Sequence, residues 1–263
     1  MKTIKKLFVI TKVSLANTLT YRVTIITRFV FYTLYIYIFM SLWRTIYKDS
    51  SLNGYGYAQI VWYLIVTEFI SFVIGSDYYT NMNEEVKTGS IAYQIGRPVR
   101  YVFYQFANAL GQICVNGACF GLLAVVLGFV FAGALPTFQM VGLPAFALSM
   151  ALSIVLQFFI LTLIGLSAFV FEDNYGIFLI YQKLCFMLGM LLPVEFLPDW
   201  LQSIAKGLPF SYVYWAPAGL FVNYSRSAAL EILPRQAGWA VAAVVVTLLC
   251  YRQCVKRLQV NGG

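Results

Sequence analysis

The chain has no histidine, and only 11% of its 263 residues are charged. Soluble proteins usually carry a charge on about a quarter of their residues, so most of this chain is expected to lie in lipid. Histidine is the commonest metal ligand and the commonest acid–base group near neutral pH. Its absence, with carboxylates scattered along the chain, argues against a metal centre or a catalytic site inside the membrane.

A loop that would bind the phosphates of ATP is missing as well. Such a loop needs glycines followed by Gly-Lys-Ser or Gly-Lys-Thr, so that backbone N–H groups and the lysine meet the phosphates. The only Lys-Gly neighbour pair, Lys206-Gly207, has its residues in the wrong order. We therefore expect no catalytic residue, cofactor or metal ion in this chain, and any ATP must be bound by another polypeptide.

Six stretches are apolar enough to cross a bilayer, which takes about 20 residues per helix. They predict one all-α transmembrane domain over residues 1–263. Residues 1–22 alternate basic and apolar positions, which is typical of a helix lying in the membrane interface. The first span is rich in aromatic residues and the last is short. The predicted spans cover about 27–43, 57–75, 103–131, 143–171, 177–192 and 236–251.

Lysine and arginine are unevenly divided between the connections. If the N-terminus is cytoplasmic, 13 of them lie in the inner segments and 5 in the outer ones. Cytoplasmic loops of membrane proteins carry such an excess, so both termini are expected inside.

Two connections are long. The cytoplasmic loop at 76–102 is the more charged, and the external segment at 193–235, rich in Pro, Trp and Phe, is expected to form short helices at or dipping into the outer surface.

The cytoplasmic stretch 83–99 is the most informative local sequence. Gly89 and Gly96-Arg97-Pro98 predict turns on either side of one short helix. Its apolar and charged side chains suit docking into a groove on a cytoplasmic partner, although a solvated connector is equally compatible with the pattern. The residues predicted for this contact are Glu84, Glu85, Lys87, Gly89, Ile91, Arg97 and Pro98.

Two segments carry a resemblance to a known family. Glu85, Gly89 and Arg97-Pro98 before a new span resemble the loop between the second and third helices of type-2 ABC exporter permeases, where this loop is the coupling helix that contacts the ATPase. The stretch 193–201, with the prolines that follow it, resembles the family's short external helices. The layout of spans and termini is similar too. The external gate residues that the resemblance implies are Pro193, Pro198, Trp200, Pro209, Phe210 and Pro217.

The resemblance implies a separate-chain permease without a fused ATPase domain, placed in the bacterial cytoplasmic membrane. Its substrate would be amphipathic or hydrophobic, such as a drug, a lipid, a peptide or a glycan-linked molecule. Two ATPase subunits, which bind ATP and Mg²⁺, would act in trans, and a second permease, identical or related, would complete the path. The net charge of +8 is expected to serve membrane orientation rather than nucleic-acid binding.

Polar and aromatic side chains inside the predicted spans are candidates for the substrate path. An unpaired carboxylate at depth costs on the order of 2.5 kcal/mol or more, so Glu68 must be paired, protonated or facing water. Arg28 in the first span is an available partner, and both a structural ion pair and a proton or substrate site stay open. The other candidates, for which helix packing is favoured over a substrate path, are the amides Gln105, Asn108, Gln112 and Asn116 on one helix face and the aromatic residues Tyr32, Tyr35 and Phe39.

Other function classes stay open. An ion- or proton-coupled secondary carrier would use Glu68 as its coupling site, and would show an inverted repeat and broken helices at the midplane, of which the sequence gives no sign. An intramembrane enzyme would need a nucleophile–base set or a metal cluster. A purely structural membrane subunit is also compatible with the sequence.

Overall fold

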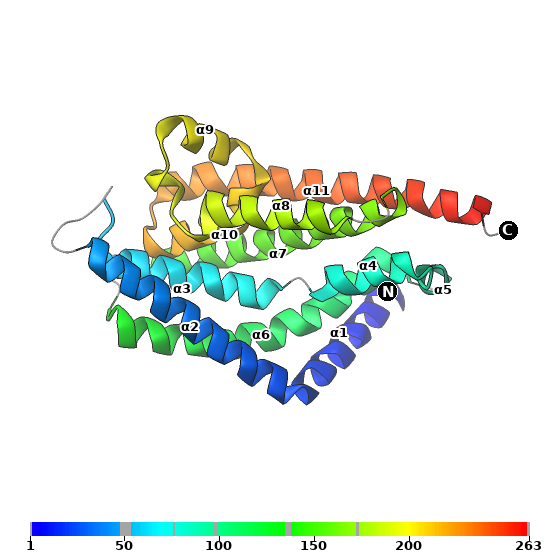
Figure 1. The fold of residues 1–263 in the computed structure, drawn as a ribbon, viewed down its shortest axis with the longest axis horizontal. Coiled ribbons are helices and arrows are strands. Elements are labelled where there is room, and N and C mark those ends of the chain that lie inside the picture. Colours follow the sequence, from blue (N-terminus) through cyan, green and yellow to red (C-terminus); the bar gives the residue numbers. More distant parts are fainter. Residues whose placement is uncertain are drawn as a thin grey trace.

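The computed structural model of the chain describes residues 2–47, 54–75, 77–96, 99–134, 138–171 and 174–261. Every regular element in this part of the chain is helical, as the hydrophobic runs predict. Figure 1 shows the long helices running lengthwise through one bundle, with the first helix set at an angle to the rest. The lengthwise helices include α2 (Arg22–Ile46), α3 (Tyr57–Ile74), α6 (Tyr101–Phe131), α7 (Leu143–Leu166) and α11 (Arg226–Asn261).

Within the described residues, five helical segments are long and apolar enough to cross a membrane. They correspond to five of the six predicted spans. The remaining predicted span coincides with a shorter apolar helix, Tyr175–Met190, in which α8 (Tyr175–Cys185) continues as a π-helical turn (Phe186–Met190). The α-helical membrane class is therefore confirmed, and the count of six depends on whether this shorter helix spans.

The last helix is longer than the sequence predicts. It has 36 residues and begins at Arg226, ten residues before the predicted start, with Pro234 inside it. The Ser225 hydroxyl accepts a hydrogen bond from the Ala228 N–H at 3.1 Å, which caps the polar first turn. An ion pair between Arg235 and Glu231 supports the next turn. The prediction of a short last span is wrong because it counted only the apolar residues of this helix.

The first helix, α1 (Lys2–Thr20), lies against α6. Thr11 donates to the Ala107 carbonyl at 2.9 Å, and Ser14 donates to the Asn108 carbonyl at 2.6 Å. Gly111 makes this approach possible, since a Cβ there would lie 2.5 Å from the Thr11 carbonyl oxygen. The predicted helix thus exists and is bound to a spanning helix, while its position in the membrane interface stays a prediction.

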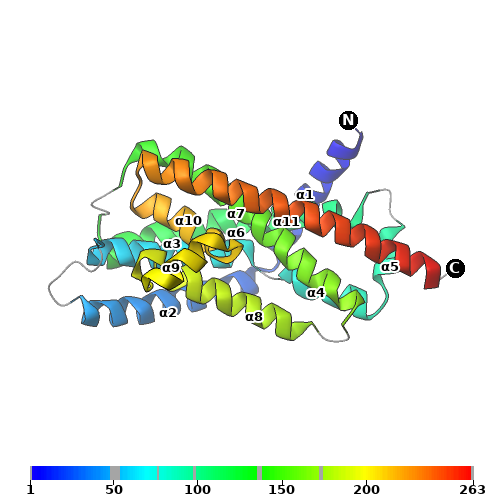
Figure 2. The same cartoon turned by 90° about the horizontal axis from the view of Figure 1, so that it is seen from above.

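The two ends of the bundle carry different short helices. Both termini lie at the end with α4 (Asp77–Lys87) and α5 (Ile91–Ile95), as Figures 1 and 2 show. The other end carries α9 (Asp199–Gly207), from which α10 (Pro209–Val222) turns back into the bundle and is almost wholly buried. Short 3-10 turns cover Met140–Gly142, Ser167–Phe169 and Val194–Phe196. Short helices predicted for the external segment are therefore present.

Candidate functional site

A cavity of about 490 Å³ lies beside the second half of α3. Figure 2 shows α2 and α8 on the same side of the bundle, and these two helices form its flanks. α2 packs against α3 and α6, whereas α8 packs against α7 and α10, so the cavity lies between two separately anchored helices. Its lining includes Tyr35 and Phe39 of α2, Glu68 and Phe72 of α3, Gln157 of α7, Tyr181 of α8 and Tyr214 of α10.

Glu68 is the acidic group of this cavity, and its side chain is only 4% exposed. It forms no hydrogen bond or ion pair with another residue in the part of the chain that the structure describes. The predicted partner, Arg28, donates to the Phe72 carbonyl at 2.6 Å, and its guanidinium lies over the rings of Phe72 and Phe120. Arg28 therefore ties α2 to α3 one helical turn away from the carboxylate.

The predicted aromatic residues of the first span separate into two roles. Tyr32 is buried and donates to the Ile65 carbonyl at 2.9 Å, so it fixes α2 on α3. Tyr35 and Phe39 line the cavity with Glu68. Tyr35 is also 45% exposed, so the cavity reaches the surface of the protein along α2.

The four amides of α6 are not brought into the cavity. Gln105 donates to the Glu85 carboxylate at 3.3 Å and to the Tyr101 hydroxyl at 3.0 Å. The backbone carbonyl of Asn108 accepts the hydrogen bond from α1. Asn116 is buried and Gln112 is half-buried. The contacts of Gln105 support packing between helices rather than a place in a substrate path.

Glu85 joins three helices at the end that carries the termini. Its carboxylate accepts hydrogen bonds from the Tyr101 hydroxyl at 2.5 Å, from Gln94 at 3.3 Å and from Gln105 at 3.3 Å. These donors come from α5 and α6, and Glu85 itself lies on α4. The residue predicted as a partner contact is thus already engaged within the chain.

The other predicted coupling residues divide by exposure. Ile91 is fully buried, whereas Glu84, Lys87 and Gly89 are exposed. Arg97 and Pro98 lie outside the described residues. Tyr93 of α5 is 80% exposed, and it is not among the residues that the sequence predicts. A large aromatic side chain in water on a short surface helix is a common feature of protein interfaces.

A second connection leads from the same end to the cavity. The Tyr78 hydroxyl of α4 donates to the Gln157 carbonyl at 3.2 Å, and the Tyr181 hydroxyl of α8 donates to the Gln157 side chain. Tyr79 donates to Asn174 at 3.1 Å. Because Gln157 and Tyr181 line the cavity, α4 is in direct contact with its wall.

At the opposite end, Glu195 makes hydrogen bonds that connect the segment 193–235 to the rest of the bundle. The Trp215 indole N–H donates to its two carboxylate oxygens at 3.2 and 3.1 Å, and the Tyr55 hydroxyl donates at 3.5 Å. Burial, together with the neighbouring Glu195 carboxylate, raises the pKa of Tyr55, so its hydroxyl stays protonated. Neither Glu195 nor Trp215 is among the gate residues that the sequence predicts, although Glu195 lies inside the stretch that carries the resemblance.

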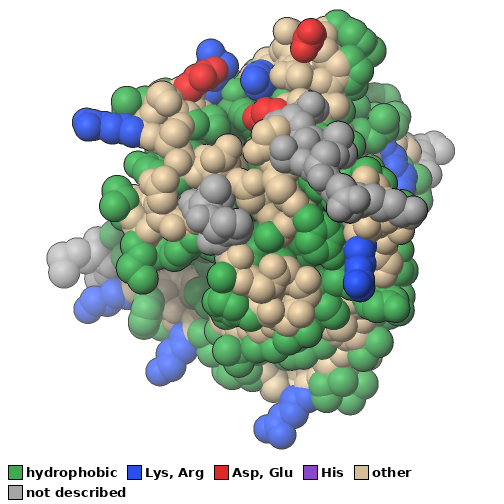
Figure 3. Space-filling view, turned by 90° about the vertical axis from the view of Figure 1, so that its left-hand side faces the viewer, with side chains coloured by type: hydrophobic (Ala, Val, Ile, Leu, Met, Phe, Trp, Pro, Cys, Tyr) green, Lys and Arg blue, Asp and Glu red, His purple; other side chains and the backbone are tan. Residues whose placement is uncertain are grey.

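The predicted gate residues take several positions in this segment. Pro193 and Pro217 are buried, Pro209 and Phe210 are half-buried, and Pro198 is exposed. Trp200 is 67% exposed on α9. Figure 3 shows this end of the molecule, where hydrophobic and uncharged groups cover most of the face and basic side chains lie around its edge. The proline-rich segment therefore consists of an exposed helix, α9, and a buried helix, α10.

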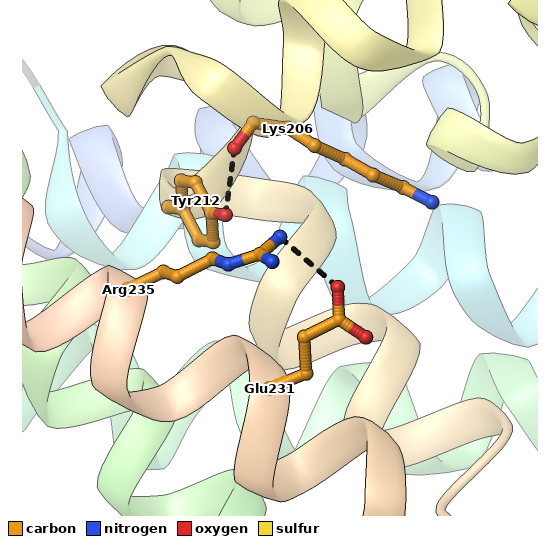
Figure 4. Close-up of polar contacts among 4 residues, drawn as sticks. All are labelled: Lys206, Tyr212, Glu231 and Arg235. Atoms are coloured by element: carbon orange, nitrogen blue, oxygen red, sulfur yellow. Dashed lines mark hydrogen bonds and ion pairs between the residues drawn. The ribbon is translucent and has the colours of Figure 1, made fainter.

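Hydrogen bonds hold α9 onto α10. The Tyr212 hydroxyl donates to the Lys206 carbonyl at 2.8 Å, next to the Arg235–Glu231 ion pair (Figure 4). Ser211 donates to the Ala205 carbonyl at 2.6 Å, which satisfies a carbonyl at the end of α9. The C-terminal end of α9 is thus attached to the first turn of α10 by hydrogen bonds.

Gln236 joins α7, α10 and α11 inside the bundle, and the sequence gives it no role. Its side-chain oxygen accepts from Ser149 at 2.8 Å. Its nitrogen donates to Ser153 at 2.9 Å and to the Ser149 and Tyr212 carbonyls at 3.0 Å. A buried amide needs such partners, so Gln236 fixes the relative positions of the three helices.

The bundle contains several helices that are long and apolar enough to span a membrane, and a cavity lies among them. These features define a multi-pass α-helical membrane protein. A family model described as ABC-2 family transporter protein matches residues 41–262. The chain therefore belongs to the ABC-2 transporter family, and its resemblance to type-2 ABC permeases is confirmed. No curated protein matches the chain. Membership makes it a non-catalytic membrane component of a transporter and implies ABC ATPase subunits as partners in general.

Proposed function

We propose that this chain is the transmembrane subunit of an ATP-driven exporter in the bacterial cytoplasmic membrane, with both termini in the cytoplasm. It exports an amphipathic or hydrophobic substrate with ATPase subunits acting in trans. The observation that carries the proposal is the carboxylate of Glu85, which joins α4, α5 and the start of α6 at the end with the termini. A force applied to these short helices passes directly to a spanning helix.

The exposed residues of this end are where we place the ATPase. Glu84, Lys87 and Tyr93 face outward from α4 and α5. Movement of α4 is passed on by Glu85 to α6 and by Tyr78 to α7, where Gln157 lines the cavity. ATP-driven association of two ATPases would therefore shift the cavity wall as a rigid-body motion.

The external segment is the proposed outer gate. Glu195 holds Trp215 of α10, and Tyr63 of α3 donates to the Gly189 carbonyl at 2.5 Å in the kinked π-helical turn after α8. π-Helical turns are frequent at functional sites because they interrupt a helix locally. We place the path between two permease subunits, identical or related, with α9 and α10 closing its outer end.

A mild-detergent purification of the tagged chain from its native membrane tests the partnership. We expect an ATPase with a Gly-Lys-Ser or Gly-Lys-Thr phosphate loop to copurify near one-to-one, and mass spectrometry to identify any second permease. Recovery of the chain alone, with ATP-independent transport in vesicles, would refute the proposed function.

One observation favours a second candidate function. Glu68 lies in a membrane cavity without an ion-pair partner among the described residues, as the coupling carboxylate of a proton-driven carrier would. Transport by vesicles that contain the chain and its ATPase separates the two functions. An imposed proton gradient drives uptake by a carrier without ATP, whereas the exporter requires ATP hydrolysis and tolerates a proton ionophore.

A further inference from the structure

The cavity beside α3 has the size and lining of a site for a drug-sized molecule. Such sites enclose about 300–1,000 Å³ and combine apolar and aromatic walls with a few placed polar groups. This cavity measures about 490 Å³. Its aromatic lining includes Tyr35 and Phe39 on α2, Phe72 on α3, Tyr181 on α8 and Tyr214 on α10.

Charge gives this cavity its selectivity. Glu68 is its only acidic side chain among the described residues, and no described residue neutralises it. Arg28 is held on the Phe72 carbonyl and the aromatic rings beside it. A carboxylate at this depth is stable when a positive charge lies next to it, and the aromatic faces around it also attract cations.

The one basic residue that lines the cavity in the described structure, Lys183, is at the rim. Its side chain on α8 is exposed, and it forms no ion pair with Glu68. A long lysine stem keeps the ammonium group in water while its methylene groups cover apolar surface. The inner part of the cavity therefore contains the Glu68 carboxyl group and, among the described residues, no basic side chain.

We propose that this cavity binds a lipophilic organic cation, with its positive charge beside Glu68 and its apolar groups against Tyr35 and Phe39. The exposed edge of Tyr35 provides a route from the surface of α2, which faces away from the bundle over most of its length. The inference rests on the proposed function only for the export of this ligand. Binding itself requires no ATPase.

Binding of radiolabelled tetraphenylphosphonium to the purified full chain in detergent tests the proposal. Tetraphenylborate, an anion of the same shape, is the matched ligand control. We expect saturable binding of the cation at one site per chain and no saturable binding of the anion. Glu68→Gln should weaken cation binding by about tenfold or more, because it removes the charge and keeps the shape.

Two further variants keep the test decisive if Glu68→Gln folds poorly. Glu68→Asp retains the charge and should bind the cation within about threefold of the original chain. Lys183→Gln removes a like charge from the rim and should tighten cation binding. Size-exclusion profile and thermal unfolding of each variant verify folding.

Equal affinity for the two ions, or unchanged cation binding in a folded Glu68→Gln, overturns the cation site. That result is distinguishable from failure of the proposed function. If the chain binds tetraphenylphosphonium through Glu68 but never copurifies with an ATPase, the site stands and the exporter assignment falls. If the ATPase copurifies and the cation does not bind, the exporter assignment stands and the substrate class falls.

Discussion

Each end of the bundle is organised around one glutamate, Glu85 at the end with the termini and Glu195 at the end with α9. Both carboxylates accept hydrogen bonds from an aromatic side chain, Tyr101 in the first case and Trp215 in the second. They differ in what surrounds them. Glu85 lies under exposed residues on short surface helices, whereas Trp215 belongs to α10, which is almost wholly buried.

This difference suggests how the two ends share the work of transport. Under the proposed function, a glutamate that joins surface helices to α6 would transmit the movement of a bound ATPase to that helix. A glutamate that holds a buried helix resists movement until the helices around it separate. Loss of the hydrogen bonds of Glu85 and loss of those of Glu195 should therefore give different defects. The following substitutions separate the two.

Replacement of Glu85 with lysine should have the largest effect. It removes the acceptor shared by Tyr101, Gln94 and Gln105 and places a positive charge there. Hydrogen bonds to charged groups contribute about 1.5–3 kcal/mol each, so the free energy of unfolding should fall by about 3 kcal/mol or more. Transport into vesicles should be lost. Thermal unfolding in detergent and ATP-dependent transport are the measurements.

Glu84 provides the matched control, because it precedes Glu85 on α4 and is exposed. Glu84→Lys should change stability by less than about 0.5 kcal/mol and still uncouple ATP hydrolysis from transport. Equal loss of stability in the two variants, or normal transport by both, would remove this end from the coupling mechanism.

Replacement of Gln236 with leucine tests the buried hydrogen bonds between α7, α10 and α11. It leaves the Ser149 and Tyr212 carbonyls and two serine hydroxyls without this partner inside the bundle. Each buried group left unsatisfied costs about 1–3 kcal/mol, so the expected loss of stability is about 2 kcal/mol. Gln253→Leu, at an exposed position of the same helix, should change stability by less than about 0.5 kcal/mol. A similar loss in both variants would show that the amide network adds nothing.

The sequence predicts the spanning helices well where apolar runs are long. α3, α6 and α7 follow from hydropathy alone, because burial in lipid requires such runs. The polar start of α11 does not follow in this way, since its first turn is stabilised by the Ser225 cap and an ion pair rather than by lipid. Gln236 could not be assigned either, because its partners come from two other helices.

The inward role of Glu85 had a readable signal. Tyr78, Met82 and Glu85 are spaced by four and three residues, so they share one helical face, and the two apolar members are buried. That spacing predicts an inward Glu85 and an outward Glu84. The pairing of Tyr35, Phe39 and Glu68 in one cavity has no such signal, since it depends on how α2 packs against α3.

Replacement of Trp215 with phenylalanine should loosen the outer end moderately. Phenylalanine keeps the aromatic contact with Tyr212 and loses the two hydrogen bonds to Glu195. We expect a loss of about 1–2 kcal/mol in stability and faster amide hydrogen exchange in α9. Trp200→Phe, at an exposed site on α9, should leave exchange unchanged. Unchanged exchange in Trp215→Phe would show that Glu195 does not hold the segment.

Replacement of Tyr93 with alanine should have the smallest effect on the fold, because its side chain is mostly in water. Stability should stay within about 0.5 kcal/mol of the original chain. If α5 is where the ATPase docks, loss of an aromatic contact should weaken its association by about tenfold, as for other interface anchors. Tyr21→Ala, at an exposed position between α1 and α2, is the matched control and should leave association unchanged. The measurement is the affinity of the purified ATPase for each variant in nanodiscs. Equal affinity for the two variants would show that the ATPase does not dock on α5, and would remove the argument that this end of the bundle transmits the movement of the ATPase.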